Sequence, residues 1–237
     1  PMSYLKHIRQ DLQDMQAYTV QNATGMVKLD AMENPYRLTD RLQAELGQRL
    51  GAVAVNRYPG ERIDDLKHAI AHHVGVPDGY ALMLGNGSDE LIALLALACH
   101  APGATVLAPE PGFVMYAMSA KLQGLSYVPV SLRDDFELDE PAMADAIAKH
   151  RPAIVYLAYP NNPTGNLWDA GCMKRLIAQV AAYGGWVVLD EAYTEYLPPE
   201  LRYDALAWVR QYPNLIVSRT FSKAYGLAGL RVGFGIA

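Results

Sequence analysis

The feature that most constrains the fold is a regular alternation of short apolar runs with segments of helical periodicity. Seven apolar runs of strand length lie at residues 81–84, 105–108, 125–130, 153–158, 186–189, 215–218 and 232–236. Helical patterns lie at residues 62–74, 89–100, 113–123, 140–149, 169–183 and 202–210. Fully apolar strands that alternate with helices are typical of a parallel sheet covered on both faces. We therefore predict an α/β fold with a mostly parallel seven-stranded sheet and helices on both faces.

Residues 1–57 do not follow this alternation, and we interpret them as an N-terminal arm before a large domain at residues 58–237. The arm contains a short helical start, a strand-like Val27-Lys28-Leu29 and a polar stretch around Asn34-Pro35-Tyr36. Such an arm usually packs on another surface, so a partner subunit is expected. The chain stops after Gly233-Phe234-Gly235, inside a strand-like run, where a domain seldom ends. We therefore expect that C-terminal sequence is missing from this chain.

Composition narrows the class of protein. Apolar residues make up 51% of the 237 residues and charged residues 19%, which favours a large core over disorder. The formal charge of −5 argues against a nucleic-acid surface. No apolar run reaches the ~18 residues of a membrane span, and the first residues lack the apolar stretch of a signal peptide. Cys99 and Cys172 lie in apolar helical patterns and are expected to be buried free thiols in a cytoplasmic protein.

The segment from Ser218 to Gly233 carries the strongest chemical signal. Lys223 lies among hydroxyl groups and small residues, with Arg231 eight positions later. A lysine amine is nucleophilic only when deprotonated, so burial or a neighbouring cation must lower its pKa. The guanidinium of Arg231 is such a cation, and its planar fork suits phosphate oxygens. The segment fits a lysine that binds an aldehyde as a Schiff base beside a phosphate. An ordinary loop with Lys223 at the surface remains open.

Two further motifs follow the first two predicted strands, at residues 81–84 and 105–108. They lie at the edge where open α/β sheets bind ligands. Gly85-Asn86-Gly87-Ser88-Asp89-Glu90 precedes an apolar helix, whose N-terminus favours a phosphate. An ordinary helix start with Ser88 as N-cap is the alternative, and both can hold. In Pro109-Glu110-Pro111-Gly112-Phe113, Phe113 could stack on an aromatic ring, although core packing is the stronger interpretation of that residue alone.

Polar residues also follow the central predicted strands. One such segment is Tyr159-Pro160-Asn161-Asn162-Pro163-Thr164-Gly165. Its Asn162 is held extended by the following proline and could donate to a ligand oxygen. A generic polar turn is the alternative. Asp190 follows a fully apolar strand, so its carboxylate must be paired or protonated. A protonated heterocyclic nitrogen would be a suitable partner, and Tyr193 could donate to a phenolate oxygen on the same ring.

Several of these residues, and a histidine pair, have other possible roles. Asp190 could be a helix cap, a metal ligand or a nucleotide-hydrolysis acid, but the chain has no Gly-x-x-x-x-Gly-Lys phosphate loop. His68 and His72 have the spacing of a metal pair on a helix, but a solvated helix face is favoured because no third ligand is evident. We predict no metal site. Asn56-Arg57-Tyr58-Pro59-Gly60 alone indicates only a turn.

Taken together, the motifs resemble the fold-type I pyridoxal-phosphate aminotransferases, and most closely the histidinol-phosphate aminotransferases. The resemblance runs from Leu29 onward and includes Asn161 to Gly165, Asp190 to Tyr193 and the lysine segment. It also includes the arm motif Asp30 to Tyr36, the segment Asn56 to Pro59 and the glycine motif Gly85 to Glu90. The combination is highly specific for the superfamily and moderately specific for the substrate.

The resemblance implies a role for each of these residues around pyridoxal 5'-phosphate. Lys223 would hold the cofactor aldehyde and move the substrate proton, and Asp190 would keep the pyridine nitrogen protonated. Tyr193 and Asn162 would contact the phenolic oxygen and Phe113 would stack on the ring. The residues implied for the phosphate are Thr220, Ser222, Arg231 and the backbone near Gly87, Ser88 and Asp89. Tyr58 would reach the cofactor phosphate of a neighbouring subunit, which implies a homodimer.

The implied reaction converts L-histidinol phosphate and 2-oxoglutarate to imidazole acetol phosphate and L-glutamate, a step of histidine biosynthesis. An aminotransferase for aromatic or other amino acids, a cofactor-binding fragment without turnover, and less favoured decarboxylase and nucleotide-binding roles remain alternatives. Two departures stand out. Asp30 and Met32 occupy positions where family members commonly carry asparagines. The family also continues for roughly another third of its length, as a smaller domain that clamps the substrate with an arginine.

Overall fold

The computed structural model describes residues 6–16, 19 and 21–237. The chain divides into two compact units, residues 1–33 and residues 34–237. In the first unit the described residues form α1 (Gln10–Gln13) and no strand. The strand-like interpretation of Val27-Lys28-Leu29 is therefore wrong. Val27 and Leu29 are 84% and 82% exposed, so no partner strand or core surface holds this short run extended.

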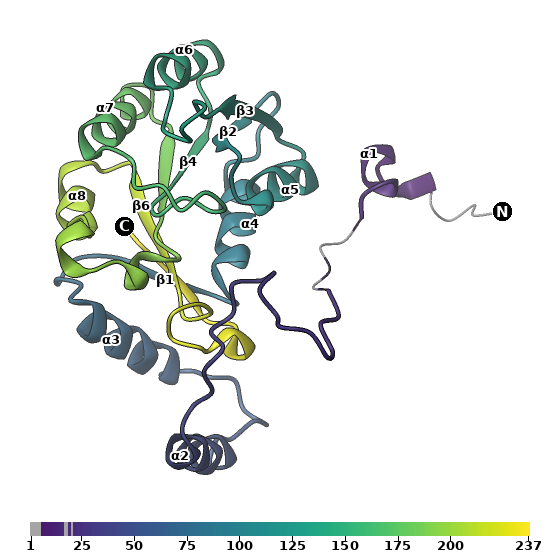
Figure 1. Ribbon diagram of the computed structural model, residues 1–237, viewed down its shortest axis with the longest axis vertical. Coiled ribbons are helices and arrows are strands. Elements are labelled where there is room, and N and C mark those ends of the chain that lie inside the picture. The colour runs from purple at the N-terminus through teal and green to yellow at the C-terminus, as the bar shows by residue number, and fades with distance from the viewer. Residues whose placement is uncertain (1–5, 17–18, 20) are drawn as a thin grey trace. The chain divides into compact units, whose positions relative to one another are not determined.

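The second unit contains a seven-stranded sheet, which confirms the predicted fold (Figure 1). Its strand order is β1-β7-β6-β5-β4-β2-β3. Neighbouring strands are parallel except that β7 runs antiparallel to β1 and β6. The strands are β1 (Leu82–Gly85), β2 (Thr105–Glu110), β3 (Ser126–Ser131), β4 (Ile154–Ala158), β5 (Trp186–Asp190), β6 (Leu215–Thr220) and β7 (Gly233–Ile236).

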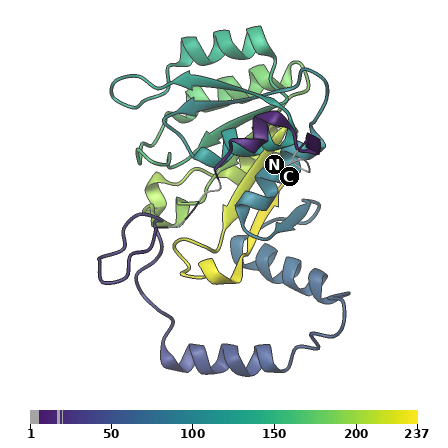
Figure 2. The same ribbon diagram turned by 90° about the vertical axis from the view of Figure 1, so that its right-hand side faces the viewer.

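The helices lie close to their predicted positions. They are α3 (Arg62–Val74), α4 (Ser88–Ala98), α5 (Val114–Gln123), α6 (Glu140–His150), α7 (Ala170–Ala181) and α8 (Ala205–Gln211). One further helix, α2 (Asp40–Gly51), was not predicted and lies within residues 1–57, the segment assigned to the arm. None of its residues is buried, and Figure 2 shows it set apart from the sheet. Asp139 is the N-cap of α6, because its side chain accepts from the Ala142 amide.

Each face of the sheet has its own apolar core, and the central strands contribute to both. Along β5, Val187 and Leu189 pack against α6, α7 and α8, whereas Val188 packs on the opposite face with α4 and α5. Successive side chains of a strand point to opposite faces, so a strand covered on both sides must be apolar throughout. This burial explains why the central strands read as continuous apolar runs in the sequence.

The topology brings the carboxyl ends of six strands to one edge of the sheet. Strands β2, β3, β4, β5 and β6 run in the same direction, so their carboxyl ends share that edge. Strand β1 joins them because it is antiparallel to β7, which is itself antiparallel to β6. The loops after these strands therefore converge, as they do in ligand-binding α/β folds. In the described part of the chain, no helix has the length and apolarity needed to cross a bilayer.

Candidate functional site

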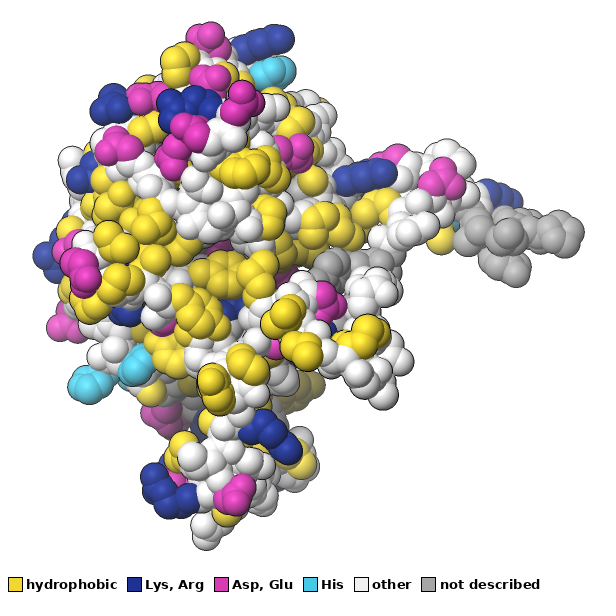
Figure 3. Space-filling model, in the orientation of Figure 1, with side chains coloured by type: hydrophobic (Ala, Val, Ile, Leu, Met, Phe, Trp, Pro, Cys, Tyr) yellow, Lys and Arg dark blue, Asp and Glu magenta, His cyan; other side chains and the backbone are white. Residues whose placement is uncertain are grey.

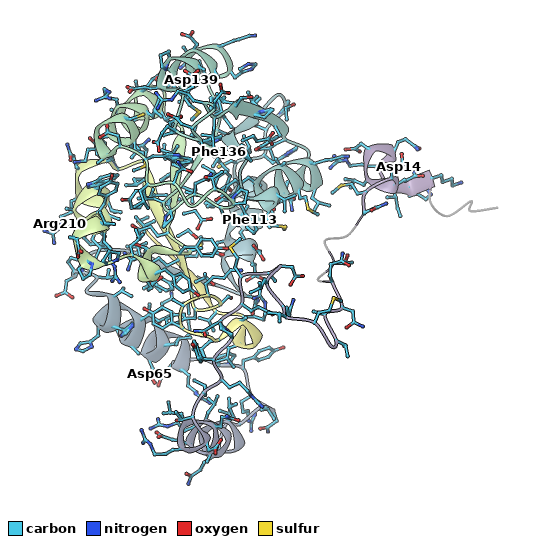
Figure 4. The ribbon with its side chains drawn as sticks, in the orientation of Figure 1. Asp14, Asp65, Phe113, Phe136, Asp139 and Arg210 are labelled. Carbon is cyan, nitrogen blue, oxygen red and sulfur yellow. The ribbon has the colours of Figure 1, made fainter. Side chains whose placement is uncertain are left out.

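A cavity lies at this shared edge, and it gathers most of the predicted site residues. The loop after β2 contributes Phe113, which Figure 4 labels near the start of α5. All the predicted residues other than Gly87 and Tyr58 line the cavity. Four lining residues were not predicted. The full lining comprises Ser88, Asp89, Phe113, Tyr116, Ala158, Pro160, Asn162, Asp190, Ala192, Tyr193, Thr220, Ser222, Lys223 and Arg231.

Asp190 supplies a buried carboxylate at the end of β5, with 6% of its surface exposed. Its Oδ1 accepts from the Ala192 amide at 3.0 Å, and its Oδ2 accepts from the Tyr116 hydroxyl at 2.7 Å. Burial raises the pKa of Asp190 above its ordinary value, while the two hydrogen bonds and the nearby Lys223 oppose that rise. A buried carboxylate of this kind favours a positively charged partner in the cavity.

Lys223 and Tyr193 come from different loops and face the same space. The Lys223 Nζ lies 5.7 Å from the centre of the Tyr193 ring. The Asn162 amide donates to the Tyr193 hydroxyl at 3.4 Å, which joins the loops after β4 and β5. Its neighbour Asn161 has a structural part instead, because it is buried and donates to Thr164 and to the Pro111 carbonyl. Of the two adjacent asparagines, Asn162 therefore lines the cavity, whereas Asn161 holds the surrounding loops together.

Arg231 and the start of α4 form a positive end of the cavity. The guanidinium of Arg231 donates to the Ser222 hydroxyl at 3.3 Å and to the Asn86 carbonyl at 3.2 Å, and it lies 3.8 Å from Asp89. Helix α4 begins after Gly87 without a side-chain cap, so its first amides are not satisfied by a capping side chain. An arginine beside the positive end of a helix dipole favours an anion between them.

Gly87 supports this positive end without lining the cavity. Gly87, and not Ser88, is the N-cap of α4, with φ of 85°, which favours glycine. The alternative of Ser88 as N-cap is therefore wrong, because Ser88 is already the first helical residue. A Cβ on Gly87 would collide with the guanidinium of Arg231. The glycine thus allows the arginine to lie against the helix start.

Gly233 makes an equally close approach, and its substitution gives a first prediction. A Cβ on Gly233 would lie 2.5 Å from the carbonyl carbon of Gly87, and backbone cannot move aside as a side-chain tip can. We expect Gly233→Ala to destabilise the protein by about 1–3 kcal/mol through overpacking. Urea unfolding measures this. Gly229→Ala is the matched control, because nothing lies within 4 Å of its Cβ, and it should change stability by less than about 0.5 kcal/mol. Equal stability of both variants would contradict the close approach.

Tyr58 is the predicted residue that the chain does not bring to the cavity. It is 99% exposed and lines a separate surface hollow with Val55, Ile63 and Leu66. A tyrosine this exposed has no packing role within the described residues of its own chain. Its predicted contact with a neighbouring subunit stays a prediction.

Tyr116, Ala158, Pro160 and Ala192 are the lining residues that sequence reasoning missed. Ala158 and Ala192 carry no functional group, so nothing distinguishes them from core residues in the sequence. Tyr116 belongs to the predicted helical pattern of residues 113–123. A polar aromatic one turn after a strand-end motif is the signal that could have found it, since a buried tyrosine hydroxyl needs a partner.

The site therefore combines a buried acid, a lysine, two phenol or amide donors and an anion-binding end. Phe113 is half-buried beside them, with its ring 5.6 Å from that of Tyr116. Among the described residues, no three histidine, cysteine, aspartate or glutamate side chains gather as metal ligands would. The chemistry available is that of a lysine amine that shares a cavity with a buried carboxylate and an anion-binding end.

The sequence profile of the family described as aminotransferase class I and II matches residues 24–237. The chain belongs to this aminotransferase family. Two curated relatives are the histidinol-phosphate aminotransferases of Polaromonas naphthalenivorans and Methylibium petroleiphilum, each 58% identical over 229 residues. The matches cover 97% of this chain and 61% and 60% of the relatives. This aminotransferase-family chain therefore spans about three fifths of the length of those relatives.

Solved structures of the family have the same fold. The histidinol-phosphate aminotransferase from Sinorhizobium meliloti, in complex with pyridoxal-5'-phosphate, matches with a TM-score of 0.80 and 27% identity over 100% of this chain and 64% of that one. An aspartate aminotransferase mutant from Thermus thermophilus has a TM-score of 0.80 at 20% identity, with 97% of this chain and 62% of that one covered. The second likeness concerns the fold alone.

Proposed function

We propose that this chain is a pyridoxal-5'-phosphate-dependent aminotransferase. The observation that carries the proposal is that Lys223 and the buried Asp190 share one cavity with the positive end formed by Arg231 and α4. Lys223 suits the cofactor aldehyde, Asp190 suits the ring nitrogen, and the positive end suits the phosphate. The family match and the relatives that share 58% identity support the same conclusion.

The anion-binding end fits the cofactor phosphate. Arg231 would pair with phosphate oxygens, and the amides at the start of α4 would donate to them. Ser222 already accepts from Arg231, and Thr220 accepts from the Ser222 amide at 3.1 Å, so both hydroxyl groups are fixed near that end. We propose that this phosphate site belongs to a large cofactor-binding domain at residues 58–237.

The remaining cavity residues fit the ring. Asp190 would hold a proton on the ring nitrogen, because a buried carboxylate gains most from a charged partner. Tyr193 and Asn162 would donate to the phenolic oxygen, and Phe113 would stack on the ring face. When bound, pyridoxal 5'-phosphate supplies an aldehyde that takes up an amino group and a protonated ring that accepts the electron pair.

Lys223 would perform the proton transfer. Its Nζ would take the proton from the substrate α-carbon and return it to the carbon of the cofactor aldehyde, so that one amine acts first as the base and then as the acid. The loop that carries Lys223 is held by two contacts: the Gly226 amide donates to the Lys223 carbonyl at 2.9 Å, and the Asn34 amide donates to the Ala224 carbonyl at 2.9 Å. These bonds fix the backbone of the loop at Lys223 and Ala224.

The substrate that we propose is L-histidinol phosphate, with 2-oxoglutarate as amino acceptor. The support is that two relatives are histidinol-phosphate aminotransferases and share 58% identity with this chain over 97% of its length. We further propose a cytoplasmic homodimer in which Tyr58 reaches the phosphate site of the other subunit. The exposure of Tyr58 supports this, because its ring is 99% accessible on the isolated chain. No nucleic acid or membrane enters the proposal. In the second unit, acidic and basic side chains are interspersed on the face in Figure 3.

A panel of amino donors tests the proposed substrate. The purified protein with pyridoxal 5'-phosphate and 2-oxoglutarate is offered histidinol phosphate, histidinol, phenylalanine and aspartate, and glutamate formation is measured. We expect a kcat/KM for histidinol phosphate at least about 100-fold above that for histidinol. Histidinol lacks the phosphate group, and the loss of hydrogen bonds to a charged group costs about 3 kcal/mol of binding free energy. Preference for phenylalanine would support an aromatic aminotransferase instead. Cofactor binding without glutamate formation from any donor would support a binding-only chain.

A further inference from the structure

Tyr116 makes a contact that none of the proposed roles uses. It is the third residue of α5, only 3% exposed, and its hydroxyl donates to Asp190 Oδ2 at 2.7 Å across 74 residues of sequence. Hydrogen bonds to an ionised acceptor are shorter and stronger than those between neutral groups. The contact therefore joins a helix on one face of the sheet to the acid at the end of β5.

The ring of Tyr116 is fixed by aromatic neighbours on two sides. It stacks on Tyr156 of β4, with ring centres 4.2 Å apart and planes 7° apart. The Phe113 ring meets it edge-on, with centres 5.6 Å apart and planes at 88°. Aromatic contacts of this kind restrict ring orientation. The hydroxyl is consequently directed at the carboxylate by packing.

Each oxygen of the Asp190 carboxylate accepts a hydrogen bond from a different element of the fold. The Ala192 amide fixes Oδ1 and the Tyr116 hydroxyl fixes Oδ2. Hydrogen bonds to the charged form lower the pKa of an acid, whereas burial raises it. Burial and the neighbouring Asp190 raise the pKa of Tyr116 itself well above its ordinary value, so its hydroxyl keeps its proton and stays a donor. The pair therefore has a defined direction of donation.

We propose that Tyr116 is a positioning residue that holds the Asp190 carboxylate in place and ionised. This inference rests on the proposed function, because it gives Tyr116 a part in keeping the ring nitrogen protonated through Asp190. Simple core packing is the competing explanation. The titratable and charged groups that face Asp190 from the surrounding elements are Tyr116 of α5, Tyr156 of β4, Asp89 of α4, and Lys223, Tyr193 and Arg231 of the loops.

Tyr156 offers a matched control in the same aromatic stack. It is 1% exposed, and among the residues that the structure describes its hydroxyl has no hydrogen-bond partner. Replacing either tyrosine by phenylalanine keeps the stacked rings. Only the Tyr116→Phe change removes a donor from Asp190. A structural role in packing would make the two variants alike, whereas the positioning role separates them.

Steady-state kinetics of the two variants across pH test the inference. We expect Tyr116→Phe to lower kcat by about 10- to 100-fold, the range for a hydrogen bond to a charged group, with KM nearly unchanged. The acid limb of its kcat/KM profile should move to higher pH, because the lost donor lets the pKa of Asp190 rise and the carboxylate must be ionised to act. Tyr156→Phe should leave kcat and the profile as in the wild type. Equal behaviour of the two variants would overturn the inference.

A readout without cofactor keeps this test separate from that of the proposed function. Carbon-13 labelling of aspartate carboxyl groups, with Asp190→Asn to assign the signal, follows Asp190 in the cofactor-free protein. Its titration should occur at higher pH in Tyr116→Phe than in the wild type or Tyr156→Phe. An unchanged titration would refute the positioning role even if transamination is confirmed. A shifted titration with no transamination by the wild type would support the positioning of the carboxylate and refute the proposed function.

Discussion

Replacing Lys223 by alanine is expected to slow transamination by at least about 100-fold. The lysine is the cavity residue proposed to hold the cofactor and to move the substrate proton, and general acid–base catalysis alone is worth about 10²–10⁴-fold in rate. We therefore expect the rate of glutamate formation from histidinol phosphate to fall by about 10²–10⁴-fold or more. Initial rates at saturating cofactor and substrate measure the effect.

The control for this variant is Lys149→Ala, which removes an exposed lysine from the last turn of α6, outside the lining of the cavity. It should react at the wild-type rate. Thermal unfolding of both variants checks that neither loses its fold. Comparable rates for Lys223→Ala and the wild type would remove Lys223 from the mechanism.

The second large effect concerns a buried ion pair next to Asp190. The Nε and Nη2 of Arg219 on β6 both lie 2.7 Å from Oε2 of Glu191, whose side chain is 1% exposed. Burial raises the pKa of Glu191, and the charge and hydrogen bond of Arg219 oppose that rise. Arg219→Met leaves a buried carboxylate without its cation. We expect a loss of about 3–5 kcal/mol in the free energy of unfolding, measured by urea titration near pH 8.

Acid should reduce this loss. Without Arg219 the pKa of Glu191 rises further above its value in the unfolded chain, so the penalty is present at high pH and disappears as pH falls through the raised folded-state pKa. The double variant Glu191→Leu with Arg219→Met should recover most of the stability, because no charge then remains buried.

A surface pair provides the comparison. Arg175 and Glu140 are 2.6 Å apart with side chains 62% and 35% exposed, so Arg175→Met should cost less than about 1 kcal/mol. A similar loss for Arg219→Met would show that the buried pair contributes no more than an exposed one.

The part of the site that can be predicted from the sequence is the part that follows from the burial of the central strands. Strands buried on both faces must be apolar throughout, so a polar residue such as Asp190 directly after one marks the edge of the sheet. Parallel topology then brings Asp190, Asn162 and Lys223 to that same edge, although 61 residues separate Asn162 from Lys223 in the numbering of the chain. Their convergence needed no knowledge of side-chain packing.

The parts that sequence reasoning missed depend on packing between elements. Tyr116 sits within an apolar helical pattern, and only the approach of α5 to β5 shows that its hydroxyl meets Asp190. The run Val27 to Leu29 has strand-forming residues but no neighbouring strand, so local propensity misled the prediction. The regular leucines Leu42, Leu46 and Leu50 of helix α2 lie in a segment that does not follow the alternation of strands and helices, so the alternation does not predict this helix.

Chemical trapping of the cofactor tests the central claim most directly. The purified protein is mixed with pyridoxal 5'-phosphate, reduced with borohydride, digested, and mapped by mass spectrometry, with Lys223→Ala treated in parallel. We predict one pyridoxyl group per chain, on the peptide that contains Lys223, and none at a defined site in the variant. A reduced adduct on a different lysine, or the same adduct yield in Lys223→Ala, would contradict the assignment of this cavity.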